Sequence, residues 1–455
     1  MGLLLMAATL TLGIAGSTRA AMYYVDGGNA AAEDDNDGAE KTPWKTIQKG
    51  AGAAQAGDTV IVKPGKYDEV VTLKTSGAAD KLLTLRSELS RKARVKGFKI
   101  EGDYLAVEGF EITNDAKDAQ GIFAGEAHQK TAGKGCRFVD NFIHDLGGTA
   151  VTSGEHALVK GNLMKNVFRG VFVNSGTLVE DNEVDTLVAP LVDRDGEKWP
   201  AKTQYAFFVG DDIIFRGNYF HGCPEEKLLK WGVDFFVTWD AWILGPSHRI
   251  LIERNRCFNA THGCEAEATT LKQSSYITFR NNLFVNTVYV GVLPKEWSHI
   301  TVENNTFINC GAYPVWFCTE RQCEGAVVRN NLIAYWKQDR LLKLKWTPAE
   351  SGIAYNPVRQ NPKMTIACDY NMFWGCKNRG YGQHDFTAEP QFVDPEHDDF
   401  RLKPGSPGVD AGVTIEDVKT DLRGVFRPQG KAYDIGAYEL EQPESSEASV
   451  DKGGK

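Results

Sequence analysis

The stretch Phe279-Arg280-Asn281-Asn282-Leu283-Phe284 is one copy of a short pattern that recurs along most of this chain. The pattern is an apolar–polar–apolar run, then Asn, then an apolar pair. The repeated positions are Asn141, Asn162, Asn182, Asn218, Asn255, Asn282, Asn305, Asn331 and Asn371. Successive positions lie 21, 20, 36, 37, 27, 23, 26 and 40 residues apart. A period in the low twenties with occasional long insertions is typical of a solenoid.

Each copy of the pattern alternates apolar and polar residues with period two, which predicts short strands rather than helices. Asn tolerates the left-handed backbone conformation at a tight corner, and its amide can bond to the Asn one coil above. The repeat therefore predicts an all-β coil of stacked parallel strands, with the insertions leaving the coil as loops.

The chain has 455 residues, of which 42% are hydrophobic and 24% charged, so we expect a globular protein with a sizeable core. Residues 1–20 are read as a signal peptide, because Gly2 to Gly16 is almost entirely apolar and a possible cleavage site follows. No later segment approaches the roughly 20 apolar residues that a membrane span needs. We expect a secreted protein, extracellular or periplasmic, whose residues 441–455 form a disordered Ser-, Glu- and Gly-rich tail.

The formal net charge of −9 argues against nucleic acid as a partner. The nine cysteines are an odd number, so at least one is unpaired, and no Cys/His cluster has the spacing of a zinc site. Cys223, Cys310 and Cys376 each follow a repeat Asn by five residues and are expected to be buried thiols.

Both ends of the repeat carry segments that predict caps. The Ala-rich residues 51–56 after Trp44 favour a short amphipathic helix ending at Gly57, which would cover the open end of a solenoid. Towards the other end, Phe392-Val393-Asp394-Pro395 is followed later by Asp434-Ile435-Gly436-Ala437-Tyr438-Glu439.

With the Asn repeat, these two ends resemble the secreted right-handed parallel β-helix proteins of the pectate-lyase-like superfamily. The resemblance implies an all-β fold, a right-handed parallel β-helix with a short N-terminal capping helix and a C-terminal cap. It further implies one domain over residues 21–440, with the N-terminal cap and first coil in 21–70 and the C-terminal cap in 386–440. Because this fold hosts many chemistries, it does not itself predict the activity.

The segment from His262 to Ser275 carries the candidate chemistry. In a strand, Ala266 and Ala268 share one face while Glu265 and Glu267 share the other. The alanines suit the interior, so both carboxylates are predicted to point outward. Two neighbouring like charges repel each other, and calcium, which binds carboxylate oxygens, would remove that penalty.

The spacing Glu-x-Glu-x-x-x-x-Lys-x-Ser resembles the site of polysaccharide lyase family six, the alginate lyases and chondroitinase B. The resemblance implies that Glu265 and Glu267 are calcium ligands and that Lys272 is the base that removes the C5 proton of a uronate. The family has an Arg one coil later, where this chain offers Lys295. A further metal ligand from the preceding coil has no clear match, although Asp234 and Asp240 lie in that region.

Three interpretations stay open on these residues. The first is a calcium-assisted lyase that cleaves uronate-containing polysaccharide by β-elimination. The second is a glycoside hydrolase that uses two of the four carboxylates, which would have to lie about 5–10 Å apart. The third is a glycan-binding β-helix without catalysis, and solvated glutamates with a surface lysine are the ordinary alternative to any site.

Aromatic residues concentrate in the two long intervals 182–218 and 218–255, where they either pack loops or stack on sugars. Substrate contacts are expected from Trp239, Trp242, His262, Asp234 and Asp240. A long solenoid flank suits a polymer, so the expected partner is an acidic polysaccharide bound by a monomer.

Overall fold

The computed structural model describes residues 20–125, 132–188, 191–194, 197–224, 228, 232–239, 245–267, 274–311, 313–317, 324–336, 353–355, 366–376 and 382–442. The predicted signal peptide lies outside this range except for Ala20, as does most of the predicted disordered tail. Among the described residues, no helix has the length and apolar character needed to cross a membrane.

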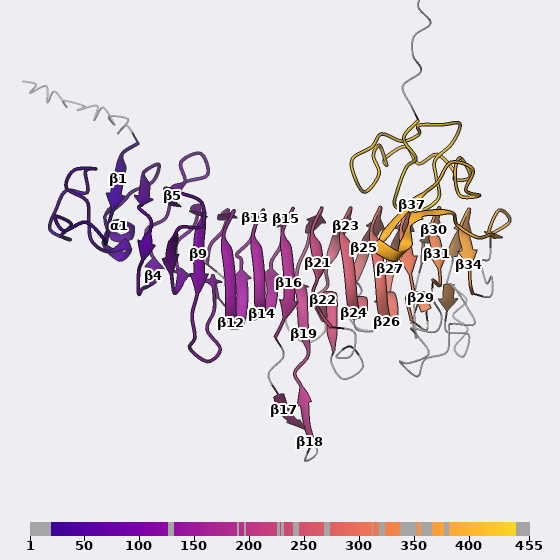
Figure 1. Ribbon diagram of the computed structural model, residues 1–455, viewed down its shortest axis with the longest axis horizontal. Helices are drawn as coiled ribbons and strands as arrows, with labels where there is room; N and C mark the ends of the chain where they lie inside the picture. Colours follow the sequence, from indigo (N-terminus) through magenta and orange to yellow (C-terminus); the bar gives the residue numbers. More distant parts are fainter. Residues whose placement is uncertain are drawn as a thin grey trace, which may run out of the picture.

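The described chain winds into a parallel β-helix whose coils stack along one axis (Figure 1). One face is a 13-stranded sheet. Its strands in spatial order are β1 (Met22–Val25), β2 (Thr59–Val62), β5 (Leu83–Ser87), β8 (Leu105–Glu108), β11 (Arg137–Val139), β13 (Leu158–Lys160), β15 (Leu178–Glu180), β20 (Ile214–Arg216), β23 (His248–Glu253), β25 (Ser274–Arg280), β27 (Trp297–Glu303), β30 (Ala326–Arg329) and β33 (Ile366–Asp369).

The remaining coil strands form a 20-stranded network. They are β3 (Gly65–Lys66), β4 (Val70–Leu73), β6 (Ala93–Val95), β7 (Gly97–Ile100), β9 (Phe110–Thr113), β10 (Ile122–Phe123), β12 (Phe142–Thr152), β14 (Leu163–Val173), β16 (Glu183–Leu187), β19 (Thr203–Phe208), β21 (Tyr219–His221), β22 (Val233–Trp239), β24 (Arg256–Glu267), β26 (Leu283–Lys295), β28 (Thr306–Ile308), β29 (Tyr313–Phe317), β31 (Leu332–Ala334), β32 (Ile353–Tyr355), β34 (Met372–Trp374) and β35 (Phe386–Thr387). The core lies between the two faces, and like side chains stack from coil to coil, as in Val159↔Val179↔Phe215.

A ladder of asparagines runs through the interior at the corner between the two faces. Asn282 shows the pattern: its Oδ1 accepts bonds of 3.0 Å from both the backbone N–H and the side-chain amide of Asn255. Its own amide donates to the carbonyl of Ile252 at 2.7 Å. Asp385 accepts from Asn371 in the same way and ends the ladder. The predicted coil-to-coil amide bonding is confirmed.

The left-handed corner residue is not the ladder Asn itself, as the sequence suggested, but the residue before it. These preceding residues have φ between 51° and 68°, and they are Asp140, Gly161, Asp181, Gly217, Arg254, Asn281, Asn304, Asn330 and Tyr370. The reason is that each ladder Asn turns its amide inward to bond the coils on either side, while the residue before it makes the turn.

The two long intervals are not only loops. The first contains the additional coil strand β19 and the second contains β22. These two strands contribute four aromatic side chains to the main core: Tyr205, Phe208, Phe235 and Phe236. The first interval also contains the antiparallel hairpin β17 (Leu191–Arg194) and β18 (Glu197–Pro200), which projects from the coils in Figure 1.

The N-terminal end of the core is closed by α1 (Ile47–Ala53), which begins earlier than the predicted helix. Ile47 and Ala51 are buried in the main core. Gly50 allows the helix to lie close, because a Cβ there would be 2.8 Å from Val60.

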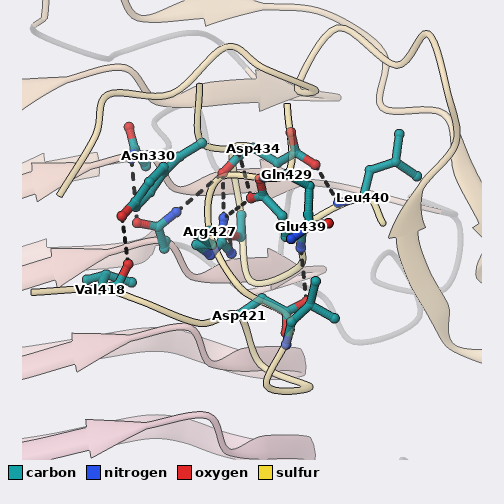
Figure 2. A network of polar contacts seen from close by, with 12 residues as sticks. Asn330, Val418, Asp421, Arg427, Gln429, Asp434, Glu439 and Leu440 are labelled. Carbon is teal, nitrogen blue, oxygen red and sulfur yellow. Dashed lines mark hydrogen bonds and ion pairs between the residues drawn. The ribbon is translucent and has the colours of Figure 1, made fainter. Parts of the chain in front are cut away.

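The C-terminal segment, which contains β36 (Phe392–Asp394), the 3-10 helix η2 (Pro395–His397) and β37 (Asp399–Leu402), folds back along the flank of the last coils (Figure 1). Asn281 and Asn330, two of the left-handed corner residues, donate to the carbonyls of Thr420 and Val413, both at 2.8 Å. Within the segment, the fully buried Arg427 bonds Glu439 at 2.8 Å and the carbonyl of Gly436 at 2.8 Å (Figure 2). A buried charge needs such partners, and this network supplies them to Arg427.

Replacing Asn282 with Ala is expected to lower the free energy of unfolding by at least about 2 kcal/mol. The substitution leaves two buried donors of Asn255 without an acceptor, and each unsatisfied group costs about 1–3 kcal/mol. Urea unfolding followed by circular dichroism measures the loss. The exposed Asn29→Ala is the control, with an expected change within about 0.5 kcal/mol; equal effects of the two substitutions would contradict the role of the ladder.

Candidate functional site

The strand β24 places Glu265 and Glu267 on the outer side of the coil, as predicted. Cys264, which precedes Glu265, and Ala266, which lies between the two glutamates, are both in the main core. The Glu265 side chain is 12% exposed and that of Glu267 is 34% exposed, so the first is mostly covered and the second reaches solvent.

The coil register brings a third acid to the same place. On β22, Phe235 and Phe236 both point into the core. Asp234 and Val237, on either side of this pair, therefore point away from the coil interior. Asp234 pairs with His262 of β24, and Oδ1 of Asp234 lies 2.6 Å from Nδ1 of His262. The Asp234 side chain is fully buried.

Asp234, His262 and Glu265 form one compact cluster, since a ligand atom from each lies within 4.8 Å of the others. We call these three residues the acid–imidazole cluster. Because the strands stack in register, residues 28 positions apart in the sequence meet here directly.

Burial and charge shift the titration of this cluster. Burial alone would lower the pKa of His262, but the hydrogen bond and the negative charge of Asp234 outweigh it and raise the pKa above its ordinary value. The pKa of Glu265 is also raised, first by burial and then by the charge of Asp234. A raised pKa lets the Glu265 carboxyl keep its proton nearer to neutral pH, so that it has a proton to donate, and Asp234 holds the imidazole in one orientation.

Two lysines accompany the outward glutamates. Lys202 Nζ lies 3.3 Å from Oε2 of Glu265, and Lys295 Nζ lies 3.4 Å from Oε1 of Glu267. Lys295 is in register with Glu267, one coil further along, which is the position that the sequence suggested for it. These ammonium groups supply the positive charge that the sequence analysis assigned to calcium.

The described residues do not fit a calcium ion. Calcium takes six to eight oxygen ligands, whereas the cluster offers two carboxylates and an imidazole nitrogen. Glu267, the second predicted ligand, bonds Lys295 instead of joining the cluster. Calcium held between Glu265 and Glu267 stays a prediction from the sequence resemblance.

Half-buried aromatic side chains continue the outer face beyond His262. The ring of Tyr289 meets His262 edge-on at 5.3 Å and Trp316 at 6.1 Å, and Tyr313 lies 5.2 Å from Trp316. Such rings can stack on the apolar faces of sugars. From the sequence, this role was expected of Trp239 and Trp242.

Several predicted site residues lie outside the described part of the chain: Lys272, Asp240 and Trp242, together with the side chain of Trp239. Of the others, the structure brings Asp234, His262 and Glu265 together. Glu267 lies two residues further along β24, where it pairs with Lys295 of β26. Lys202, Tyr289, Tyr313 and Trp316 were not predicted from the sequence. No local motif marks them, because their neighbours belong to other coils.

Residues 200–380 match the family described as right handed beta helix region. No curated protein matches the sequence. Pectate lyase Pel9A is similar in structure, with a TM-score of 0.52 at 14% identity, over 94% of this chain and 98% of that one. The A-module of mannuronan C-5 epimerase AlgE6 from Azotobacter vinelandii has a TM-score of 0.52 at 12% identity, over 79% and 97%. The PL6 family alginate lyase AlyGC has 0.47 at 14% identity, over 87% and 58%.

This protein is therefore a right-handed parallel β-helix, and it shares the pectate-lyase-like fold. The predicted fold class is confirmed, including the handedness of the coil. At these identities the likeness establishes the fold and leaves the activity to the residues of the site.

Replacing Asp234 with Asn is expected to lower the pKa of His262, because it removes the charge that raises that pKa. An NMR titration of the imidazole C–H signals, with the His262 signal identified by its loss in His262→Gln, measures the shift. Glu183→Gln, which removes the partner of His221 on β21, is the control and should leave the His262 pKa unchanged. An unchanged pKa in Asp234→Asn would contradict the coupling of the two residues.

Proposed function

We propose that this protein cleaves uronate-containing polysaccharide by β-elimination. The observation that carries the proposal is the buried Asp234–His262 hydrogen bond beside Glu265, on an outer face that also presents Lys202 and Lys295. This arrangement combines an oriented proton acceptor, a proton donor and positive charge.

His262 is the proposed base. Nδ1–H of His262 donates a hydrogen bond to Oδ1 of Asp234, so the lone pair of the neutral imidazole lies on Nε2. That nitrogen takes the proton from the sugar carbon that carries the carboxylate. The C–H electrons form the new carbon–carbon double bond, and the glycosidic oxygen leaves with its bonding electrons.

Glu265 and the lysines assist this step. Glu265, with its raised pKa, donates a proton to the leaving oxygen. The negative charge that develops on the uronate carboxylate is stabilised by the ammonium groups of Lys202 and Lys295. Lys272 remains a second candidate for the base, on the strength of its spacing from Glu265 and Glu267.

The structural neighbours support the choice of substrate. Pel9A is named as a pectate lyase and AlgE6 as a mannuronan epimerase, and pectate and mannuronan are both polymers of uronic acids. Such polymers lie outside the cytoplasm, so the proposal includes export of the protein, and we propose that it acts as a monomer.

Glycoside hydrolysis is the second candidate. Carboxylate oxygens of Asp234 and Glu265 lie within 4.8 Å, near the separation of about 5–5.5 Å that retaining glycosidases use. However, Asp234 is fully buried behind His262, which prevents its attack on a sugar carbon. The geometry therefore favours elimination.

Incubation with pectate, alginate and chondroitin is expected to give an unsaturated product that absorbs in the ultraviolet. His262→Gln should lower this rate by about 10²–10⁴-fold, the contribution of a general base. His248→Gln, on the opposite sheet, is the matched control and should keep the wild-type rate. Release of reducing ends without absorbance would indicate a hydrolase. Full activity of His262→Gln would transfer the role of base to Lys272, to be tested with Lys272→Met.

A chelator is expected to leave the activity unchanged, because Lys202 and Lys295 already place positive charge beside the two glutamates and the cluster does not suit calcium. The rate of absorbance increase before and after EDTA, with and without added calcium, measures this. Loss of activity that calcium restores would instead support the ion predicted from the sequence between Glu265 and Glu267.

A further inference from the structure

A pocket of about 250 Å³ lies on the same network of strands, nearer the N-terminus than the acid–imidazole cluster. Its lining includes Arg169, the aromatic residues Phe123, Phe168 and Phe172, and Asp118 at the exposed rim. The proposed reaction does not use this pocket.

Arg169 is held in place by its neighbours. Its Nε donates to Oε1 of Gln204 at 2.8 Å, and its guanidinium lies 5.7 Å from the ring centre of Phe168 and 5.5 Å from that of Phe207. A guanidinium fixed in this way loses little side-chain freedom when it binds an anion. Its flat fork suits a carboxylate, and the aromatic walls suit the apolar face of a sugar ring.

The pocket is aligned with the cluster along the solenoid. Arg169 bonds Gln204, Gln204 pairs with Asp234, and Asp234 pairs with His262. Three coil steps separate Arg169 from His262, which is about 14 Å at the usual strand spacing of about 4.8 Å. One sugar unit is similar in length to one coil step, so a few units span the distance.

The row between the two places is covered, since Gln204 is 1% exposed and Asp234 is fully buried. A bound polymer would therefore touch this face at its two ends, in the pocket and at the cluster. Two contacts on one stiff chain reinforce each other because the second binding event is intramolecular.

We propose that this pocket is a distal subsite in which Arg169 binds the carboxylate of a uronate unit about three units away from the unit at His262. The proposal rests on the proposed function for the second contact. It makes the protein selective for longer chains, because a disaccharide at the cluster does not reach Arg169. Asp118 is the one acid in the lining and lies at the rim of the pocket. Its negative charge would repel a second uronate carboxylate at the rim.

The test is the affinity for saturated disaccharides and hexasaccharides of galacturonate and of mannuronate, measured calorimetrically with the inactive His262→Gln protein. Arg169→Met is expected to weaken hexasaccharide binding by at least tenfold, equivalent to about 1.4 kcal/mol, and to leave disaccharide binding unchanged. Arg169→Lys should recover part of the loss, because it restores the charge without the fork.

Arg137→Met, at an exposed position on the opposite sheet, is the matched control and should bind both lengths as the parent does. Thermal unfolding of each variant shows whether the fold is retained. Equal hexasaccharide affinity of the Arg169 and Arg137 variants would overturn the subsite, as would an equal loss for both chain lengths or no binding of any of these oligosaccharides. Chain-length-dependent loss in Arg169→Met without any turnover by the wild-type protein would keep the subsite and overturn the lyase proposal.

Discussion

The coil-to-coil hydrogen bonds of the asparagine ladder are the constraint on which this structure depends. Each ladder amide is buried; it satisfies a backbone N–H and a carbonyl of the preceding coil and bonds the side chain of the ladder residue in the following coil. An unsatisfied buried polar group is expensive, so a coil cannot shift by one residue without leaving several such groups unpaired. A shift of one residue would also exchange the inner and outer faces of a strand.

The candidate site follows from that register. Asp234 meets His262 because β22 and β24 are locked side by side, and Glu265 joins them because two consecutive core residues separate the outward positions. Charges that would be unstable alone in this covered place are compensated locally, by His262 for Asp234 and by Lys202 for Glu265. The shifted pKa values of His262 and Glu265 follow from the same enclosure. Proton transfer near neutral pH requires groups tuned in this way.

The repeating Asn and the alternation around it were sufficient to predict the parallel β-helix, the amide ladder and the outward direction of Glu265 and Glu267. They were not sufficient for the corner geometry, which depends on the residue before each ladder Asn. The aromatic intervals were expected to be loops, yet Tyr205 and Phe235 are core residues. Large insertions hide a coil strand because the distance between Asn positions no longer equals one turn.

The sequence by itself determined the solenoid, because its corner amide and period-two strands are local features that repeat at every coil. It also determined that Glu265 and Glu267 point outward. Ala266 lies between them, and side chains alternate along a strand, so the small apolar residue takes the inward position. Only the tertiary structure decided which charged and polar side chains meet. Asp234 with His262, Lys202 with Glu265 and Arg169 with Gln204 are all contacts between different coils, and the number of residues in each intervening loop carries no signal of which side chains the stacking will align.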